Sequence, residues 1–338
     1  MRDRSALLLS ALLLCAVAPS PVWAWGATGH RIIGRVALQT LPAGLPAFLH
    51  TQDAVWQVGE TAREPDRWRG AGGEHDAERN AGHFVDLTED GKVQGVMPLS
   101  ELPATREAYD TVLRAGNSNQ YKAGYLPYSI IIGFQQLRYD FGYWRADVAG
   151  IKFAKTKAAR AWFTADRKLH ERLTLRDLAV WAHFVGDASM PLHVSVHHDG
   201  WGKYPNPDDY VSGAGIHAKF EGTFVRANFA DKDVAALMPA FHACACQIQD
   251  ETKAYLARDL EKVIPLYQLE KEGGFEAHDP RGKEFVGDRL AVGAAELRVL
   301  IAEAWTQSAT VSLGYPAIAM HDIEAGQADL LGSLQGLD

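Results

Sequence analysis

Apolar residues recur every three or four positions along most of the chain, which is the spacing of one face of an α-helix. This spacing predicts a helix over residues 29–41, which stops at Pro42. Residues 126–148 are rich in Ile, Leu, Phe, Tyr and Trp, and they predict a long buried helix. The same pattern predicts further helices over 99–115, 175–189, 233–262 and 282–310.

Local signals indicate where two of these helices begin and end. An acidic first turn and Pro103 indicate that the helix over 99–115 begins just after Ser100. Residues 174–177 resemble a capping box that opens the helix over 175–189, and Pro191 ends it.

Strand signals are few, because only the short apolar segment 82–87 has that character. Two loops stand out, over 69–82 and 197–215, and both are rich in glycine or polar residues. The sequence has no fixed-period repeat and no Gly/Ser linker. We therefore expect an all-α fold, a mainly helical single domain with irregular loops.

The first 24 residues have the features of a secretory signal peptide. Arg2 and Arg4 precede an apolar run over 6–17, which is too short to span a bilayer, and a small-residue cleavage pattern ends at Ala24. We expect a secreted or periplasmic protein that comprises residues 25–338 and is not stably inserted in a membrane. We also expect it to be a monomer.

The charge balance limits the class of partner. The chain carries 34 Lys and Arg against 42 Asp and Glu, a net charge of −8, which argues against a broad basic face for duplex DNA. Cys244 and Cys246 are two positions apart, so a bridge between them would be local. Core packing or metal ions must then hold the protein together.

Histidine and acidic residues occur four positions apart at two places. His183 and Asp187 share one helix face, and so do His217 and Glu221, while His193 lies between the pairs. Alone, each pair also fits a surface ion pair or a capped core histidine. Imidazole and carboxylate ligands without thiolates suit a hydrolytic zinc site.

Cleavage after Ala24 would give Trp25 a free α-amino group. That amine and the Trp25 carbonyl could chelate a metal ion together with His30. His83 and Asp66 also fit simpler roles, a hydrogen-bonded core histidine and a helix cap beside Pro65.

The chain resembles the secreted zinc-dependent phospholipases C and single-strand-specific nucleases of the P-one type. The resemblance runs from Trp25 to about Glu221. Its motifs, in order, are Trp-Gly-x-x-Gly-His, Pro-Asp-x-x-Arg, His-Phe-x-Asp, His-Phe-x-Gly-Asp-x-x-x-Pro-Leu-His and His-x-x-x-Glu. The fold that the resemblance implies is a mainly α-helical globule with a trinuclear zinc cleft.

The resemblance also implies which residues hold three zinc ions. The first ion would be held by Asp66, His83, His183 and Asp187. The second would be held by His193, His217 and Glu221. The third would take the amine and carbonyl of Trp25, His30 and the second oxygen of Asp187, which would thus bridge two ions.

The implied activity is hydrolysis of phosphodiester bonds in single-stranded RNA or DNA by a metal-activated water, and the resemblance extends to 3′-nucleotidase activity. Asp66 and Arg69 would be the catalytic residues, with Arg69 beside the phosphate, and Phe84 would stack on a base. A solvated loop arginine is the alternative interpretation of Arg69. Asn206 and Lys203, in the loop over 197–215, are alternative phosphate contacts.

Two other functions stay open on the sequence. Glu221 is typical of the phospholipase branch, which cleaves phospholipid headgroups, but Thr28 stands where that branch carries an acidic residue. A non-catalytic export protein that binds zinc or nucleotides is an alternative of another class.

Overall fold

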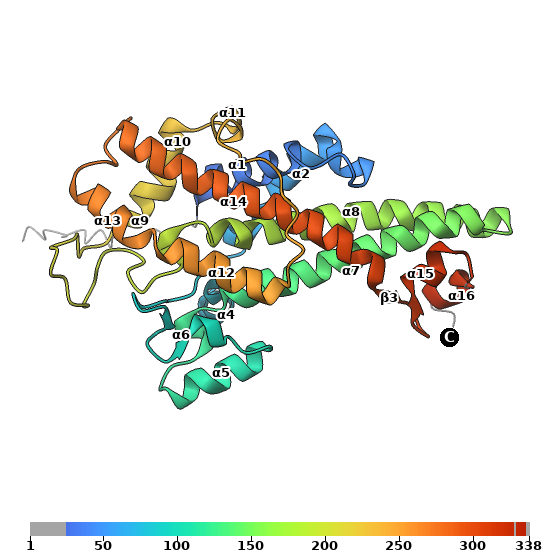
Figure 1. Cartoon of the computed structure of the whole chain (residues 1–338), viewed down its shortest axis with the longest axis horizontal. Helices are drawn as coiled ribbons and strands as arrows, with labels where there is room; N and C mark the ends of the chain where they lie inside the picture. The colour runs from blue at the N-terminus through green and yellow to red at the C-terminus, as the bar shows by residue number, and fades with distance from the viewer. Residues whose placement is uncertain (1–24, 328, 336–338) are drawn as a thin grey trace, which may run out of the picture.

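Two long helices, α7 (Leu126–Phe153) and α8 (Lys157–Asp187), form an antiparallel hairpin that sets the frame of the fold (Figure 1). The computed structural model describes residues 25–327 and 329–335. Pro127 occupies the first turn of α7, and the side chain of Thr156 caps α8 by accepting a hydrogen bond from the Ala159 N–H at 3.1 Å. The short link between the helices makes them antiparallel neighbours.

The other long helices pack around this hairpin. Helices α1 (Gly26–Gln39) and α2 (Gln52–Thr61) contact α8, and α14 (Pro280–Gln307) packs against α1, α7 and α8. The remaining helices are α3 (Glu64–Arg67), α4 (Gly73–Asn80), α5 (Arg106–Ala115), α6 (Gln120–Ala123), α9 (Ile216–Ala218), α10 (Val225–Asn228), α11 (Asp231–Ala235), α12 (Ile248–Leu260), α13 (Val263–Lys271), α15 (Met320–Glu324) and α16 (Leu330–Gln335). The fold is mainly all-α, as the sequence predicted.

Sheet structure in the described residues is confined to two small antiparallel ladders. Strand β1 (Lys92–Val93) pairs with β2 (Met97–Pro98), with Val93 opposite Met97. Strand β3 (Ser312–Leu313) pairs with β4 (Ile318–Ala319). Neither ladder forms a layer of the fold, so helix packing provides the core.

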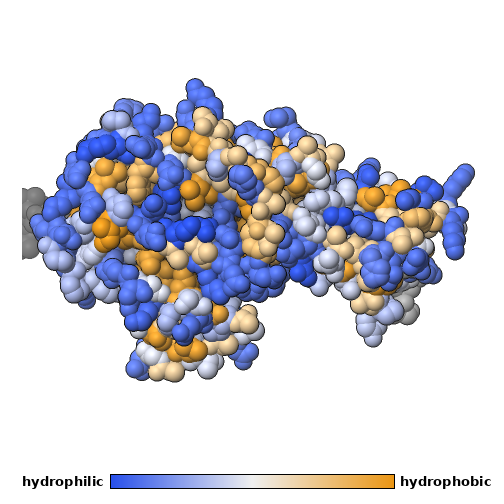
Figure 2. All heavy atoms as spheres, viewed as in Figure 1, coloured by the Kyte–Doolittle hydropathy of each residue, from blue (hydrophilic) through white to orange (hydrophobic). Residues whose placement is uncertain are grey.

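The apolar core has a main part and a smaller part. The main core lies where α1, α2, α7, α8 and α14 meet, and it includes Trp25, Phe134 and Trp181. The smaller core lies at the far end of the α7–α8 hairpin, where α15 and α16 cover it (Figure 1). Polar residues cover most of the face in Figure 2, and apolar residues appear there in separate patches. Within the described residues, none of the helices has the length and apolarity needed to cross a membrane.

The predicted starts of two helices are wrong. Thr174 does not open a helix, because α8 runs unbroken from Lys157 and the buried Thr174 hydroxyl donates to the His170 carbonyl at 2.7 Å. Ser100 lies in a 3₁₀ turn (Leu99–Glu101), and α5 begins only at Arg106. Pro103 explains this delay, since it keeps the preceding residue out of the helical region.

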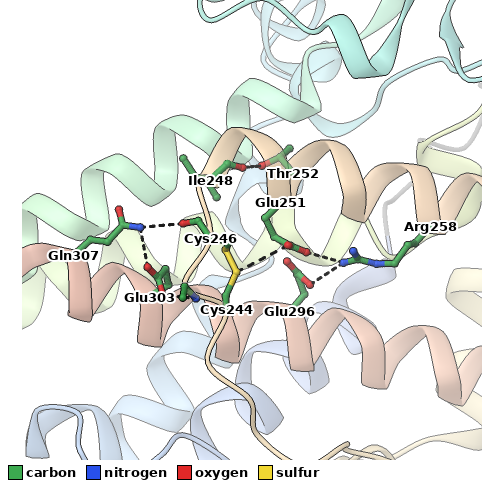
Figure 3. The surroundings of a disulfide bond; sticks show 10 residues. Cys244, Cys246, Ile248, Glu251, Thr252, Arg258, Glu296, Glu303 and Gln307 are labelled. Atoms are coloured by element: carbon green, nitrogen blue, oxygen red, sulfur yellow. Dashed lines mark hydrogen bonds and ion pairs between the residues drawn. A yellow bond between two sulfur atoms is a disulfide. The ribbon is translucent and has the colours of Figure 1, made fainter.

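The predicted helix over 233–262 is also wrong in its middle. It divides into α11 and α12, and the residues between Ala235 and Ile248 are largely without helix. A Cys244–Cys246 disulfide lies in this segment, where the Ala245 N–H donates to Glu303 at 3.1 Å (Figure 3). The bridge closes a very short loop and therefore adds little to the stability of the fold.

The segment 82–87 is not a strand. Residues Ala81–His83 form a 3₁₀ turn, Phe84 is extended, and Leu87 makes a single bridge with Val93. The other predicted helices are present with shifted ends, as α1, α7 and α14. The predicted signal peptide, residues 1–24, lies outside the described residues.

Candidate metal centre

Three buried groups of histidine and acidic side chains could each hold a metal ion. Their ligand atoms lie within 4.8 Å of one another in each group. The groups are His30, Asp66 and His183; His83, His183 and Asp187; and His193, His217 and Glu221. The structure thus brings together all eight side chains that the sequence named as metal ligands.

The C-terminal end of α8 provides the centre of this arrangement. His183 and Asp187 lie one helical turn apart on the same face, and His183 Nε2 is 3.3 Å from Asp187 Oδ2. His30, on α1, places its Nε2 3.4 Å from the other oxygen, Asp187 Oδ1. The Asp187 carboxylate therefore faces a histidine on each side.

Two short turns complete this part of the centre. Asp66 lies on α3, which Pro65 helps to start, and its Oδ1 is 3.9 Å from both His83 Nε2 and His183 Nε2. His83 lies on the 3₁₀ turn that replaces the predicted strand. These turns bring two residues that are distant in sequence from α8 against its C-terminal end.

The third group lies on the next segments of the chain. His193 lies on a 3₁₀ turn (Pro191–His193), and its Nε2 is 3.1 Å from His217 Nε2. Glu221 lies in a π-helical turn (Lys219–Phe224), with Oε2 3.0 Å from His217 Nε2 and 3.9 Å from His193 Nε2. Such turns are frequent at functional sites.

Backbone carbonyls orient the imidazoles. The Nδ1 atoms of His183, His193 and His217 lie 2.8, 2.6 and 2.7 Å from the carbonyl oxygens of Ala62, His83 and His198. A carbonyl oxygen only accepts, so each Nδ1 carries the proton and each Nε2 lone pair faces the cluster. Metal-binding histidines are typically held in this way.

The buried acceptor atoms fit a cation. Asp66 Oδ2, His83 Nε2, His183 Nε2 and both oxygens of Asp187 have no hydrogen-bond partner among the described residues. Unpaired acceptors at this depth are costly unless a positive charge serves them.

Burial also shifts the pKa values of these groups. It raises the pKa of Asp66 to about 7 and the pKa of Asp187 well above its usual range. It lowers the pKa of His83 to about 4 and the pKa of His183 and His193 well below 6.5. The neutral imidazoles of His83, His183 and His193, together with carboxylates that need a counter-charge, are suitable ligands for a divalent metal ion.

Trp25 lies where α1 begins, and it is fully buried. Its indole Nε1 donates to the Gly186 carbonyl at 2.8 Å and to Ser189 Oγ at 3.0 Å, which ties it to the end of α8. The next residue, Gly26, donates its N–H to Glu221. The start of α1 is thereby fixed between two of the segments that carry the candidate metal ligands.

The residues predicted to contact the substrate differ in how closely they approach the candidate metal ligands. Arg69 Nη1 is 3.4 Å from Asp66 Oδ1, and its side chain is partly exposed. Phe84 follows His83, but it packs against Gly124 and its stacking role stays a prediction. Asn206 is occupied within its own loop, where its amide bonds the Tyr210 backbone and Ser212.

One supporting residue was missed by the sequence reasoning. Asp199 Oδ1 accepts hydrogen bonds from the N–H groups of Gly215 at 2.7 Å and His217 at 3.1 Å. It closes the loop over 197–215 and sets the position of His217. The loop was visible in the sequence, but no spacing rule connects Asp199 to a residue 18 positions later.

Neither a protein-family model nor a curated protein matches this sequence. The geometry of the centre is therefore the basis for assigning a function.

Proposed function

We propose that the chain is a zinc-dependent phosphodiesterase that hydrolyses single-stranded nucleic acids, as in the phospholipase C and single-strand nuclease family that it resembles. The observation that carries this proposal is the convergence of eight buried histidine and acidic side chains on three adjoining groups. The ordered motifs in the sequence supply these same residues.

The residues fit three zinc ions. Asp66, His83, His183 and Asp187 would hold one, and His193, His217 and Glu221 would hold another. The third would take His30, Asp187 and the amine and carbonyl of Trp25. Bound zinc would supply Lewis acidity and lower the pKa of a coordinated water.

The protein's own groups would position the phosphate and move the proton. Arg69 is fixed beside Asp66 and partly exposed, so its planar guanidinium can present two donors to phosphate oxygens. Asp66 keeps one carboxylate oxygen without a hydrogen-bond partner in the described part of the chain, and that oxygen can accept a proton from the attacking water.

The experiment is a substrate panel on purified residues 25–338 supplied with zinc. We expect hydrolysis of RNA and denatured DNA, slower hydrolysis of duplex DNA, and loss of activity with a chelator. Zinc binding without any chelator-sensitive hydrolysis would instead support a non-catalytic binding protein.

Phospholipase C activity is the second candidate, and Glu221 is the observation that favours it. This glutamate, rather than an aspartate, completes the group with His193 and His217. Phosphatidylcholine vesicles in the same panel decide between the two. Lipid turnover without release of nucleotides would reverse the order of the candidates.

A further inference from the structure

Two adjoining hollows lie along α7 and α8 beside the metal centre. The first has a volume of about 510 Å³, and His83 and Pro65, the neighbour of Asp66, contribute to its wall. The second has a volume of about 370 Å³ and extends the first along the two helices. Both volumes are typical of ligand pockets.

The two hollows form one groove, because they share four lining residues. These are Tyr125, Ser129, Arg176 and Phe184. The Tyr125 N–H donates to the Ala81 carbonyl at 2.6 Å, and Ser129 Oγ donates to the Gly82 carbonyl at 3.0 Å. The wall of the groove is therefore fixed to the same 3₁₀ turn that carries His83.

The lining of the groove combines cations with aromatic rings. Arg79 lies 5.6 Å from the ring of Trp68, and Arg106 lies 4.2 Å from the ring of Tyr125. Arg176 lies in the part that both hollows share. In a chain of net charge −8, this groove is lined by three arginines and one acidic residue, Asp177.

Two of these arginines have acidic neighbours, but neither pairing prevents the arginine from binding a phosphate. Arg176 Nη1 is 2.5 Å from Asp177, the one acidic residue in the lining, and the Arg176 side chain is 60% exposed. Arg106 is 3.5 Å from the exposed Glu78. Exposed pairs of this kind are weak, so a phosphate can compete for the guanidinium groups.

We propose that this groove binds the part of a single nucleic-acid strand that adjoins the scissile phosphate, with Arg176 as a phosphate contact. The inference rests on the proposed nuclease function and extends it to the length of the substrate. Alternating phosphates and flat bases match a groove of arginines and aromatic rings. A phospholipid headgroup offers one phosphate and no flat ring, so it would use only part of the groove.

The test compares Arg176→Ala with Arg172→Ala, an exposed arginine one turn earlier on α8 that lines neither hollow. The substrates are a single-stranded oligonucleotide and a small chromogenic phosphodiester. We expect Arg176→Ala to lower kcat/KM on the oligonucleotide about tenfold more than on the small diester. The salt dependence of kcat/KM should fall by about 0.7 in log–log slope. Arg172→Ala should leave kcat/KM unchanged on both substrates.

Binding of a hydrolysis-resistant phosphorothioate oligonucleotide separates this inference from the proposed function. One outcome is that the wild-type protein cleaves no nucleic acid and yet binds this probe more tightly than Arg176→Ala does. In that case the proposed nuclease function is wrong, and strand binding by the groove is supported. If Arg176→Ala loses the same factor in kcat/KM on both substrates, or binds the oligonucleotide as well as the wild type does, the proposed strand-binding role of the groove is wrong. Loss of binding to phosphatidylcholine vesicles alone would also overturn it, in favour of a lipid site.

Discussion

The Nε2 atoms of His193 and His217 lie 3.1 Å apart, and both rings donate their Nδ1 protons to backbone carbonyls. Two lone pairs directed at one another need a proton or a metal ion between them. Glu221 Oε2 adds a third acceptor at 3.0 Å from His217 Nε2. A proton would bridge only two of these acceptors, whereas a zinc ion could take all three as ligands.

The position of Asp187 between His30 and His183 predicts a graded effect of ligand substitutions. Asp187→Asn should lose more activity, and more bound zinc, than His193→Ala or Glu221→Gln, since Asp187 has a different histidine against each of its two oxygens and would be a ligand of two zinc ions. Zinc content and hydrolysis rate should be measured on all three purified variants. Equal losses would contradict a bridging role for Asp187.

Because the start of α1 is buried beside the candidate ligands, we expect zinc binding and activity to depend on a free α-amine at Trp25. An extra methionine before Trp25 converts the α-amine into an amide nitrogen, which does not donate a lone pair at neutral pH. The extended protein should fold, because side chains alone would hold the other two zinc ions, but it should bind one zinc fewer and lose most of its activity. Zinc analysis of the exported and extended forms is the measurement, and equal zinc content with equal turnover would exclude the amine as a ligand.

Gly124 is predicted to be needed for the segment that carries His83. It has φ +78°, and a Cβ there would lie 2.0 Å from the Phe84 carbonyl oxygen. Gly91 has φ +75° with nothing within 4 Å, so Gly91→Ala is a matched control that costs about 1–2 kcal/mol of backbone strain alone.

Gly124→Ala should cost more than ~2 kcal/mol and also lower activity, because Phe84 must move and His83 precedes it. Urea unfolding and hydrolysis rates of the two variants provide the comparison. A Gly124→Ala protein as stable and as active as Gly91→Ala would show that Phe84 tolerates the displacement.

Asp140, which lies away from the metal centre, is expected to make the free energy of unfolding depend on pH. Burial raises its pKa from 3.8 to about 6, and one of its oxygens has no hydrogen-bond partner within the described ranges. Because the folded-state pKa is the higher one, its contribution is favourable at low pH and is lost as pH rises through about 6.

The variant Asp140→Asn does not titrate, so its stability relative to the wild type should rise by up to about 3 kcal/mol between about pH 4 and about pH 7. Using the difference between the two proteins cancels the titration of the metal centre. Urea unfolding at both pH values measures it, and a difference that stays constant with pH would contradict the shifted pKa.

The sequence predicted the helical fold because the apolar spacing is strong along α1, α7 and α14. The predicted helix boundaries were wrong where a local sequence signal competed with tertiary packing. Thr174 resembles a cap, but the helix continues through it, with the Thr174 hydroxyl bonded to the His170 carbonyl and Leu175 and Leu178 buried against the core. The break between α11 and α12 follows from residues that bond across the chain, such as Ala245 to Glu303.

The candidate ligands were predicted by the order of their motifs, since only the i, i+4 pairs carry geometry of their own. The contacts that orient them were not predictable. The carbonyls of Ala62 and His198, which hold His183 and His217, have no side-chain signature. The groove with Arg176 likewise depends on the packing of α7 against α8, which no single segment encodes.

Stepwise zinc titration into metal-free protein of residues 25–338, with bound metal and RNA hydrolysis followed together, is the decisive measurement of whether the clustered ligands form a catalytic zinc centre. We expect three zinc ions to bind per chain and hydrolysis to appear only as the cluster around Asp187 fills. Full hydrolysis in the presence of a chelator, or a protein that binds no zinc, would contradict this expectation.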